Sequence, residues 1–236
     1  MFQYPYLKPL SGRGSFFLVG VVFFVYSLCA GAAIQLYIVP EVFPHFNLGD
    51  GLAVLDSNHF SLIAKDKSAE IIEKGWGAWE LRPRLHAPAG MASMFYVLWV
   101  PKPYSMLPFN ALIHAISGCL VLWVLRQHFP WQPAILGSSL FVLNPTAMEW
   151  VSQIHRDGVF ILGNLMVMVC LLQMEKGLRL SKVGELTWGF VCGLMGTSFV
   201  WVARPHWVQV LSVSVFLCAC LIGFYCWAAG GERSEA

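Results

Sequence analysis

Apolar segments of about membrane-spanning length constrain the fold of this chain more than any other feature. A transmembrane helix needs about 20 mostly apolar residues, because the hydrocarbon core is about 30 Å thick and each helical residue rises about 1.5 Å. The segments that meet this requirement run approximately Ser15–Val39, Tyr104–Leu125, Ala134–Val151, Val159–Met174, Leu186–Ala203 and Trp207–Trp227. They are continuously apolar and lack the alternation of a membrane β-strand. They predict an all-α membrane protein with about six transmembrane helices, forming a single polytopic membrane domain over residues 1–236.

The composition favours the same interpretation. The chain is 57% hydrophobic and only 12% charged, and its mean hydropathy is +0.63. A soluble domain of this length rarely reaches such values. The net charge of +2 gives no reason to expect a nucleic-acid partner, so the expected environment is a lipid bilayer.

A long polar insert, residues 41–103, follows the first apolar segment. From His59 to Lys74, apolar residues recur near helical spacing with charged residues between them, and Gly75 ends the run. This pattern predicts an amphipathic helix on the membrane surface, followed by Trp76 as an interfacial anchor. A second apolar stretch, Pro88–Val100, is too short to span comfortably and predicts a second interfacial or partly buried helix.

The distribution of basic residues predicts the orientation, because cytoplasmic loops are enriched in Lys and Arg. With the N-terminus inside, the cytoplasmic pieces carry Lys8, Arg13, Arg126, Lys176, Arg179, Lys182 and Arg233. The short outer loops then carry only Arg156 and Arg204. Both termini are therefore expected to be cytoplasmic, with the insert on the outer face.

Two separated acidic sites share that outer face when the segments alternate across the bilayer. Asp56 lies in the insert, and Asp157 follows His155 and Arg156 between the third and fourth segments. Each aspartate has a simpler interpretation as the N-terminal cap of the helix that follows it. Asp50, between two glycines, is typical of a turn but is an alternative base.

No known metal or nucleotide motif accompanies these residues. The sequence contains no CxxC, HExxH, P-loop, dinucleotide fingerprint or GxSxG elbow. Its seven cysteines all lie in apolar segments and are expected to be buried free thiols.

The order of several short motifs resembles a known family. The insert contains Asp56-Ser-Asn-His59-Phe60 and then Arg82-Pro-Arg84-Leu-His86-Ala-Pro88. Further motifs are Pro108-Phe-Asn110, Leu143-Asn-Pro145 and His155-Arg-Asp157. Over about residues 45–175 this order resembles the N-terminal part of C-superfamily membrane glycosyltransferases, of the protein-mannosyltransferase and aminoarabinose-transferase type. Members usually have more spans, so the chain would correspond to the N-terminal portion of a larger transferase fold, to a minimal relative or to one subunit.

The resemblance implies transfer of a sugar from a polyprenyl-phosphate donor to a surface glycan, glycolipid or protein acceptor, in a bacterial inner membrane. Asp56 is then the candidate base, and Asp157 orients the acceptor, assists the base or helps Asp56 hold a divalent cation such as Mg²⁺ or Mn²⁺. The candidate phosphate-binding residues are Arg82, Arg84, His86, Lys102, Arg204 and His206, because cations stabilise a leaving phosphate. Other candidates for the site are Asp50, His59, His155 and Arg156.

Two alternative functions remain open. The Arg204-Pro205-His206 motif also looks like membrane proteins of polysaccharide gene clusters, which favours an exopolysaccharide or O-antigen polymerase or ligase. The small number of predicted spans favours a non-catalytic membrane subunit of a polysaccharide assembly complex, with a partner subunit.

Overall fold

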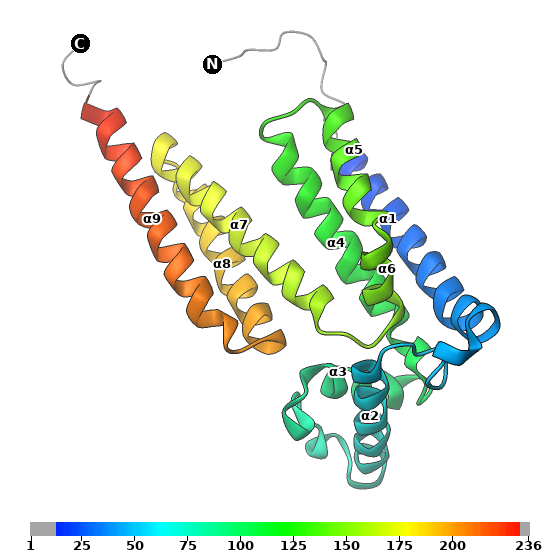
Figure 1. Ribbon diagram of the computed structural model, residues 1–236. Coiled ribbons are helices and arrows are strands. Elements are labelled where there is room, and N and C mark those ends of the chain that lie inside the picture. The colour runs from blue at the N-terminus through cyan, green and yellow to red at the C-terminus, as the bar shows by residue number, and fades with distance from the viewer. Residues whose placement is uncertain (1–12, 232–236) are drawn as a thin grey trace. The chain divides into compact units, whose positions relative to one another are not determined.

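The computed structural model describes residues 13–231, and all regular structure within them is helical (Figure 1). The α-helices are α1 (Arg13–Ala33), α2 (Leu55–Lys74), α3 (Ala87–Leu98), α4 (Leu107–Arg126), α5 (Trp131–Val142), α6 (Pro145–Ser152), α7 (Asp157–Leu180), α8 (Val183–Ala203) and α9 (Trp207–Gly231). The chain divides into two compact units at Gly158, and each is described by itself. Lys8 and Arg233, which contributed to the predicted orientation, lie outside the described residues.

Four helical segments are long and apolar enough to cross a membrane, namely Ser15–Val42, Pro103–Arg126, Asp157–Leu180 and Val183–Ala203. The first of them continues α1 through a π-helix, Ile34–Val42, and the second includes a short 3-10 turn, Pro103–Met106, before α4. These helices confirm the all-helical class and indicate a bilayer environment. The number of six spans and the outer location of the insert stay predictions.

The predicted span Ala134–Val151 is two shorter helices, α5 and α6, separated at Leu143-Asn144. The Asn144 side chain accepts a hydrogen bond from the Thr146 backbone N–H at 2.9 Å and so caps α6. The uninterrupted helix expected here is therefore wrong, because an N-cap followed by Pro145 begins a new helix. Contacts along α4 show that α5 and α6 together run antiparallel to its whole length: Gly137 beside Leu125, Val142 beside His114, and Val151 beside Asn110.

The α1, α4, α5 and α6 helices pack together through two buried clusters within this unit. Phe23 of α1, Ala115 of α4 and Val142 of α5 form one buried cluster. A second cluster joins Ala111 of α4 to Val151 of α6. Because α5–α6 returns along α4, the segment after α6 ends beside the beginning of α4.

The insert folds into a helical pair of α2 and α3. Phe60, Ile63 and Ala64 of α2 are buried against Ala92 and Tyr96 of α3. The Tyr96 hydroxyl and the Ser61 hydroxyl lie 2.8 Å apart inside this core, and burial raises the pKa of Tyr96. The predicted apolar face of α2 therefore packs mainly on protein.

The first turn of α2 differs from the sequence prediction. The helix begins at Leu55, four residues before the expected start at His59, and Val54 occupies the N-cap without a side-chain hydrogen bond. Asp56 therefore lies inside the first turn and is not the N-cap. A carboxylate there is still favoured by the positive end of the helix dipole.

The second unit contains most of α7 together with α8 and α9. The α7 and α8 backbones approach closely at Gly163 and Gly196, where a Cβ on Gly196 would lie 2.6 Å from the Gly163 carbonyl oxygen. Such small residues allow close packing between membrane helices. The side chains described on α9 are mostly apolar and exposed, as in Phe216 and Leu217.

Candidate functional site

Asp50 is held in a turn by two lysines. Its backbone is left-handed, with φ of 52°. Lys65 Nζ donates to Oδ2 at 3.0 Å, and Lys102 Nζ donates to Oδ1. Burial acts to raise the pKa of Asp50, but the hydrogen bonds from Lys102 and Lys65 outweigh it and the pKa is lowered. Asp50 therefore lies in a turn and joins it to α2 and to the segment before α4.

A buried amide connects this turn to the segment after α6. Gln153 is 2% exposed. Its Nε2 donates to the Gly51 carbonyl at 3.2 Å, and its Oε1 accepts from the Ala53 N–H at 3.0 Å. The residues after α6 therefore lie beside the segment that leads into α2.

Three chargeable side chains, those of His59, Asp56 and Arg156, act electrostatically on His86. The ring centroids of His59 and His86 lie 5.5 Å apart in an edge-on arrangement. The charges of Arg156 and Asp56 also act on His86. Burial lowers the pKa of His86 below its ordinary value of 6.5, the nearby His59 and Arg156 lower it further, and Asp56 acts in the opposite direction. His86 is therefore neutral at pH 7, with a ring N–H available to an oxygen acceptor.

Arg156 gives this cluster its positive charge. Its side chain forms no ion pair or hydrogen bond with any described residue. An arginine near His86 that has no carboxylate partner in the described part of the chain favours an anionic ligand, because its planar fork binds two phosphate oxygens. We call Asp56, His59, His86 and Arg156 the polar cluster.

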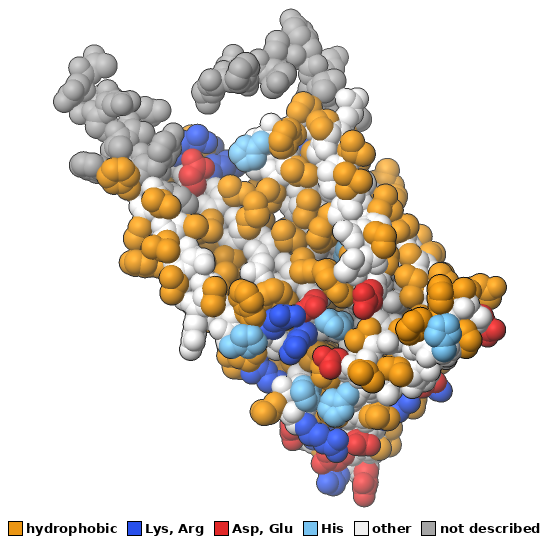
Figure 2. Space-filling model, viewed as in Figure 1, with side chains coloured by type: hydrophobic (Ala, Val, Ile, Leu, Met, Phe, Trp, Pro, Cys, Tyr) orange, Lys and Arg blue, Asp and Glu red, His pale blue; other side chains and the backbone are white. Residues whose placement is uncertain are grey.

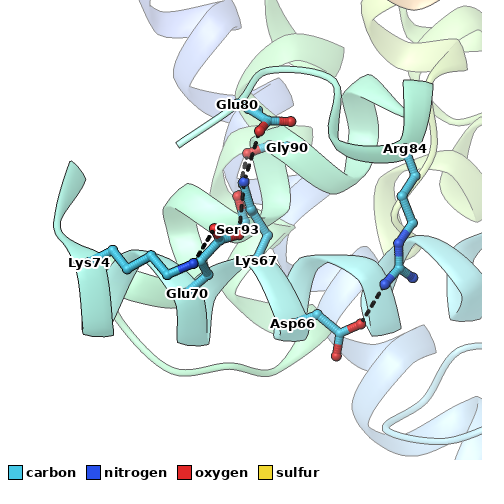
Figure 3. Close-up of polar contacts among 8 residues, drawn as sticks. All are labelled: Asp66, Lys67, Glu70, Lys74, Glu80, Arg84, Gly90 and Ser93. Atoms are coloured by element: carbon cyan, nitrogen blue, oxygen red, sulfur yellow. Dashed lines mark hydrogen bonds and ion pairs between the residues drawn. The ribbon is translucent and has the colours of Figure 1, made fainter. Parts of the chain in front are cut away.

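The segment that carries His86 connects α2 to α3 and is fixed by several contacts. Residues 75–86 are called the strap. Lys67, 8% exposed, donates to Glu70 at 3.0 Å and to Glu80 at 3.1 Å (Figure 3). Trp79 Nε1 donates to the Gly90 carbonyl at 3.0 Å. These contacts join the strap to both helices of the pair.

Two of the predicted phosphate-binding residues are engaged by carboxylates. Arg84 Nη2 donates to Asp66 at 3.2 Å on the exposed side of α2 (Figure 3), and Lys102 binds Asp50. Arg82 is half-buried in the strap. Of the phosphate-binding candidates, the structure brings His86 into the polar cluster.

The remaining predicted residues lie in two places. His155 Nδ1 lies 3.2 Å from Asp157 Oδ2, an ion pair that forms only when the imidazole is protonated. In the second unit, the Arg204 guanidinium lies 5.0 Å from the Phe160 ring centroid, and the rings of His206 and Trp207 lie 6.4 Å apart. Asp56 and Arg156 both act electrostatically on His86 in the first unit, whereas Arg204 and His206 belong to the other compact unit.

Figure 2 shows charged and histidine side chains gathered over the α2–α3 pair, while apolar side chains cover α1 and α5. Among the described residues, no group of three or more His, Cys, Asp or Glu is placed to hold a metal ion. The predicted joint binding of a cation by Asp56 and Asp157 therefore gains no support from a third ligand. The site's chemistry rests on one exposed carboxylate, two imidazoles and one guanidinium.

Gln153 and Lys65 were not predicted to contribute to the site. Gln153 follows Val151 and Ser152 at the end of an apolar segment, where an uncharged amide gives little signal. Lys65 looks like an ordinary solvated residue of an amphipathic helix. Only the fold shows that each of them binds a residue of the turn before α2.

Comparison with known proteins adds no homologue to this description. No family model matches the chain, and no curated protein or solved structure matches it either. The polar cluster and the apolar helices beside it are therefore the features of the molecule that indicate a function.

Proposed function

We propose that this protein is a membrane glycosyltransferase that uses a polyprenyl-phosphate-linked sugar. The observation that carries the proposal is the polar cluster: an exposed carboxylate, Asp56, two imidazoles and an arginine that has no carboxylate partner among the described residues. The cluster is located at the end of helices that are apolar enough to cross a bilayer. A ligand for this position has an anionic group and a lipid anchor.

The residues of the cluster divide the reaction between them. An acceptor hydroxyl oxygen forms a bond to the anomeric carbon, while the bond from that carbon to the phosphate oxygen breaks. The hydroxyl proton passes to Asp56, and the electron pair of the broken bond leaves on the phosphate. Arg156 binds the phosphate oxygens, and His86 and His59 donate ring N–H groups to them.

Exposed leucines beside the cluster fit a lipid-linked substrate. Leu55 and Leu62 lie one turn before and one turn after His59 on α2, and Leu85 precedes His86. These leucines are 76%, 52% and 89% exposed, respectively. An isoprenoid chain next to the phosphate would contact such a surface. The proposal places this end of the protein on the outer face of a bacterial inner membrane, with six spans and both termini inside.

Mass spectrometry of lipid-linked and surface glycans tests the activity in cells that carry the wild type, Asp56→Asn or Asp66→Asn. Asp66 is the matched control, because it is an exposed aspartate on the same helix whose partner is Arg84. Loss of a general base typically lowers the rate by about 10²- to 10⁴-fold. We expect a new sugar to appear with the wild type and Asp66→Asn but not with Asp56→Asn.

Binding of decaprenyl phosphate to the purified protein in nanodiscs separates the remaining functions. Arg156→Gln should weaken binding, whereas Arg84→Gln should not, because Arg84 is paired with Asp66. Retained binding without any glycan change indicates a non-catalytic subunit, and a ladder of repeat-unit masses indicates a polymerase or ligase. If Asp56→Asn behaves like the wild type, or if neither glycan nor binding responds to these substitutions, the proposal is overturned.

A further inference from the structure

The buried amide of Gln153 fixes the segment after α6 to the segment that leads into α2. Its amide is almost fully buried and satisfies one carbonyl and one N–H of the segment that leads into α2, those of Gly51 and Ala53. An amide is the side chain that can donate and accept at once. Glutamate at this position would have no proton to give to the Gly51 carbonyl, and methionine would satisfy neither group.

A second amide binds the main chain at Gln153. Asn110, in the first turn of α4, donates from Nδ2 to the Gln153 carbonyl at 2.8 Å and to the Val151 carbonyl at 3.1 Å. Both carbonyls follow the end of α6 or belong to its last turn, where carbonyl groups lack helical partners. The main chain around Gln153 is therefore fixed to α4, while its side chain is fixed to the start of α2.

The segment before α2 has little freedom to move away from these contacts. Gly51 has φ of +78°, and a Cβ there would lie 1.8 Å from the Gln35 carbonyl oxygen. The turn is thus pressed against the π-helix that extends α1. On its other side, Asp50 is bound by Lys65 and Lys102.

We infer that Gln153, held by Asn110, is a positioning residue that fixes Arg156 relative to Asp56, His59 and His86. Arg156 follows Gln153 by three residues, and Asp56 follows Ala53 by three residues. Three residues extend at most about 10 Å. A change in the contact between Gln153 and Ala53 would therefore change the position of Arg156 relative to Asp56. The importance of this for catalysis rests on the proposed function, but the positioning itself does not.

The pKa of His86 can show whether Arg156 is in place, and measuring it needs no substrate. The groups that act on His86 are Asp56 and His59 from α2 and Arg156 from the segment after α6. Removing or displacing the positive charge of Arg156 should raise the pKa of His86 toward 6.5. This pKa can be followed by NMR of the imidazole carbons, with His86→Gln to assign the signal.

The experiment compares Arg156→Gln, Gln153→Met and the double variant in nanodiscs. We expect each single variant to raise the pKa of His86, and the double variant to raise it no further than Arg156→Gln alone. Ser152→Ala is the matched control: Ser152 is the buried neighbour of Gln153, but its hydroxyl bonds to Glu149 within α6. It should leave the titration unchanged.

An unchanged pKa in Gln153→Met, alongside a raised pKa in Arg156→Gln, overturns the inference. Additive shifts overturn it too, because Gln153 would then act on His86 independently of Arg156. If Gln153→Met does not fold, Asn110→Ser provides the same comparison, because it releases the main chain of Gln153 while leaving its side chain intact. Failure of the glycan assay with a positive titration would overturn the proposed function and leave the positioning role standing.

Discussion

Arg84 and Leu85 adopt left-handed backbone conformations immediately before His86, with φ of 51° and 70°. Such conformations cost of order 1–3 kcal/mol each in residues other than glycine and persist only where the surroundings impose them. Here Arg84 is bound by Asp66, the Leu85 N–H donates to the Arg82 carbonyl, and Glu80 earlier in the strap is bound by Lys67. The two residues turn His86 toward His59, while Leu85 remains exposed.

Gly90→Ala should loosen the strap. A Cβ at this position would lie 2.1 Å from the Leu81 carbonyl oxygen and 2.6 Å from the Glu80 carbonyl oxygen, both of them backbone atoms of the strap. We expect destabilisation of the α2–α3 pair by about 1–3 kcal/mol, measured as faster amide hydrogen exchange in α3. Gly77→Ala is the control, because nothing lies within 4 Å of its added Cβ; equal exchange in both variants would contradict the close approach.

Asp50 should make stability depend on pH in the acidic range. The pKa of Asp50 in the folded state is lowered from the ordinary 3.8. The folded state therefore favours the ionised carboxylate more than the unfolded state does. The stabilisation is complete above pH 3.8 and is lost as the pH falls through the lower folded pKa. Asparagine can adopt the left-handed turn conformation, so Asp50→Asn should lower the free energy of unfolding at pH 7 by up to about 1 kcal/mol. The variant should then lose no further stability through this position as the pH falls below 3.8.

The control for Asp50 is Asp66→Asn, since Asp66 is 68% exposed and bound by one exposed arginine. Thermal unfolding of the wild type and both variants between pH 3 and pH 7 makes the comparison. A wild-type curve parallel to that of Asp50→Asn would rule out the contribution of Asp50.

At the scale of elements, α2 was predictable and the α5–α6 pair was not. The spacing of Phe60, Ile63 and Ala64 gave α2 its period, but its start was missed because Val54 provides no capping side chain to mark it. In α5–α6, the apolar residues continue across Asn144, so hydropathy shows no break. The meeting of His59 with His86 depends on how the strap folds, which local sequence does not encode.

His114 compensates for the break between α5 and α6. In a continuous helix the Val142 carbonyl would accept from the Thr146 N–H, but that N–H bonds to Asn144. His114 Nε2 lies 3.1 Å from the Val142 oxygen and takes that place. His114 therefore contacts a neighbouring helix through the Val142 carbonyl.

His114→Phe should therefore destabilise the first unit. It leaves the buried Val142 carbonyl without its partner, at a cost of about 1–3 kcal/mol, while retaining an aromatic ring against Phe141. His128→Phe, at an exposed position after α4, is the comparison. Thermal unfolding in detergent provides the measurement, and equal midpoints for the two variants would count against a structural role for His114.

At the scale of the whole molecule, the two ends of α4 define two sides of the first unit. The insert and the segment after α6 meet the beginning of α4, through Asn110 and Gln153. The connection between α4 and α5 lies at the other end, at Gln127. The proposed topology assigns these two ends to opposite compartments.

Single cysteines at Gly77 and Gln127 test this topology in a variant whose native cysteines are replaced by serine. Gly77→Cys should react with a membrane-impermeant maleimide from the outer side of intact cells. Gln127→Cys should react only after the membrane is permeabilised. Both positions are exposed, so reaction of both from one side would show that α4 does not cross the bilayer.

The interruption at Asn144 also has a consequence for biogenesis. Neither α5, with 12 residues, nor α6, with 8, is long enough to enter a bilayer as an independent helix. Their freed carbonyl at Val142 is satisfied by α4, which precedes them in synthesis. In the proposed topology, α4 would remain at the translocon until α5 and α6 have been synthesised. The three helices would then enter the lipid together as one helical hairpin.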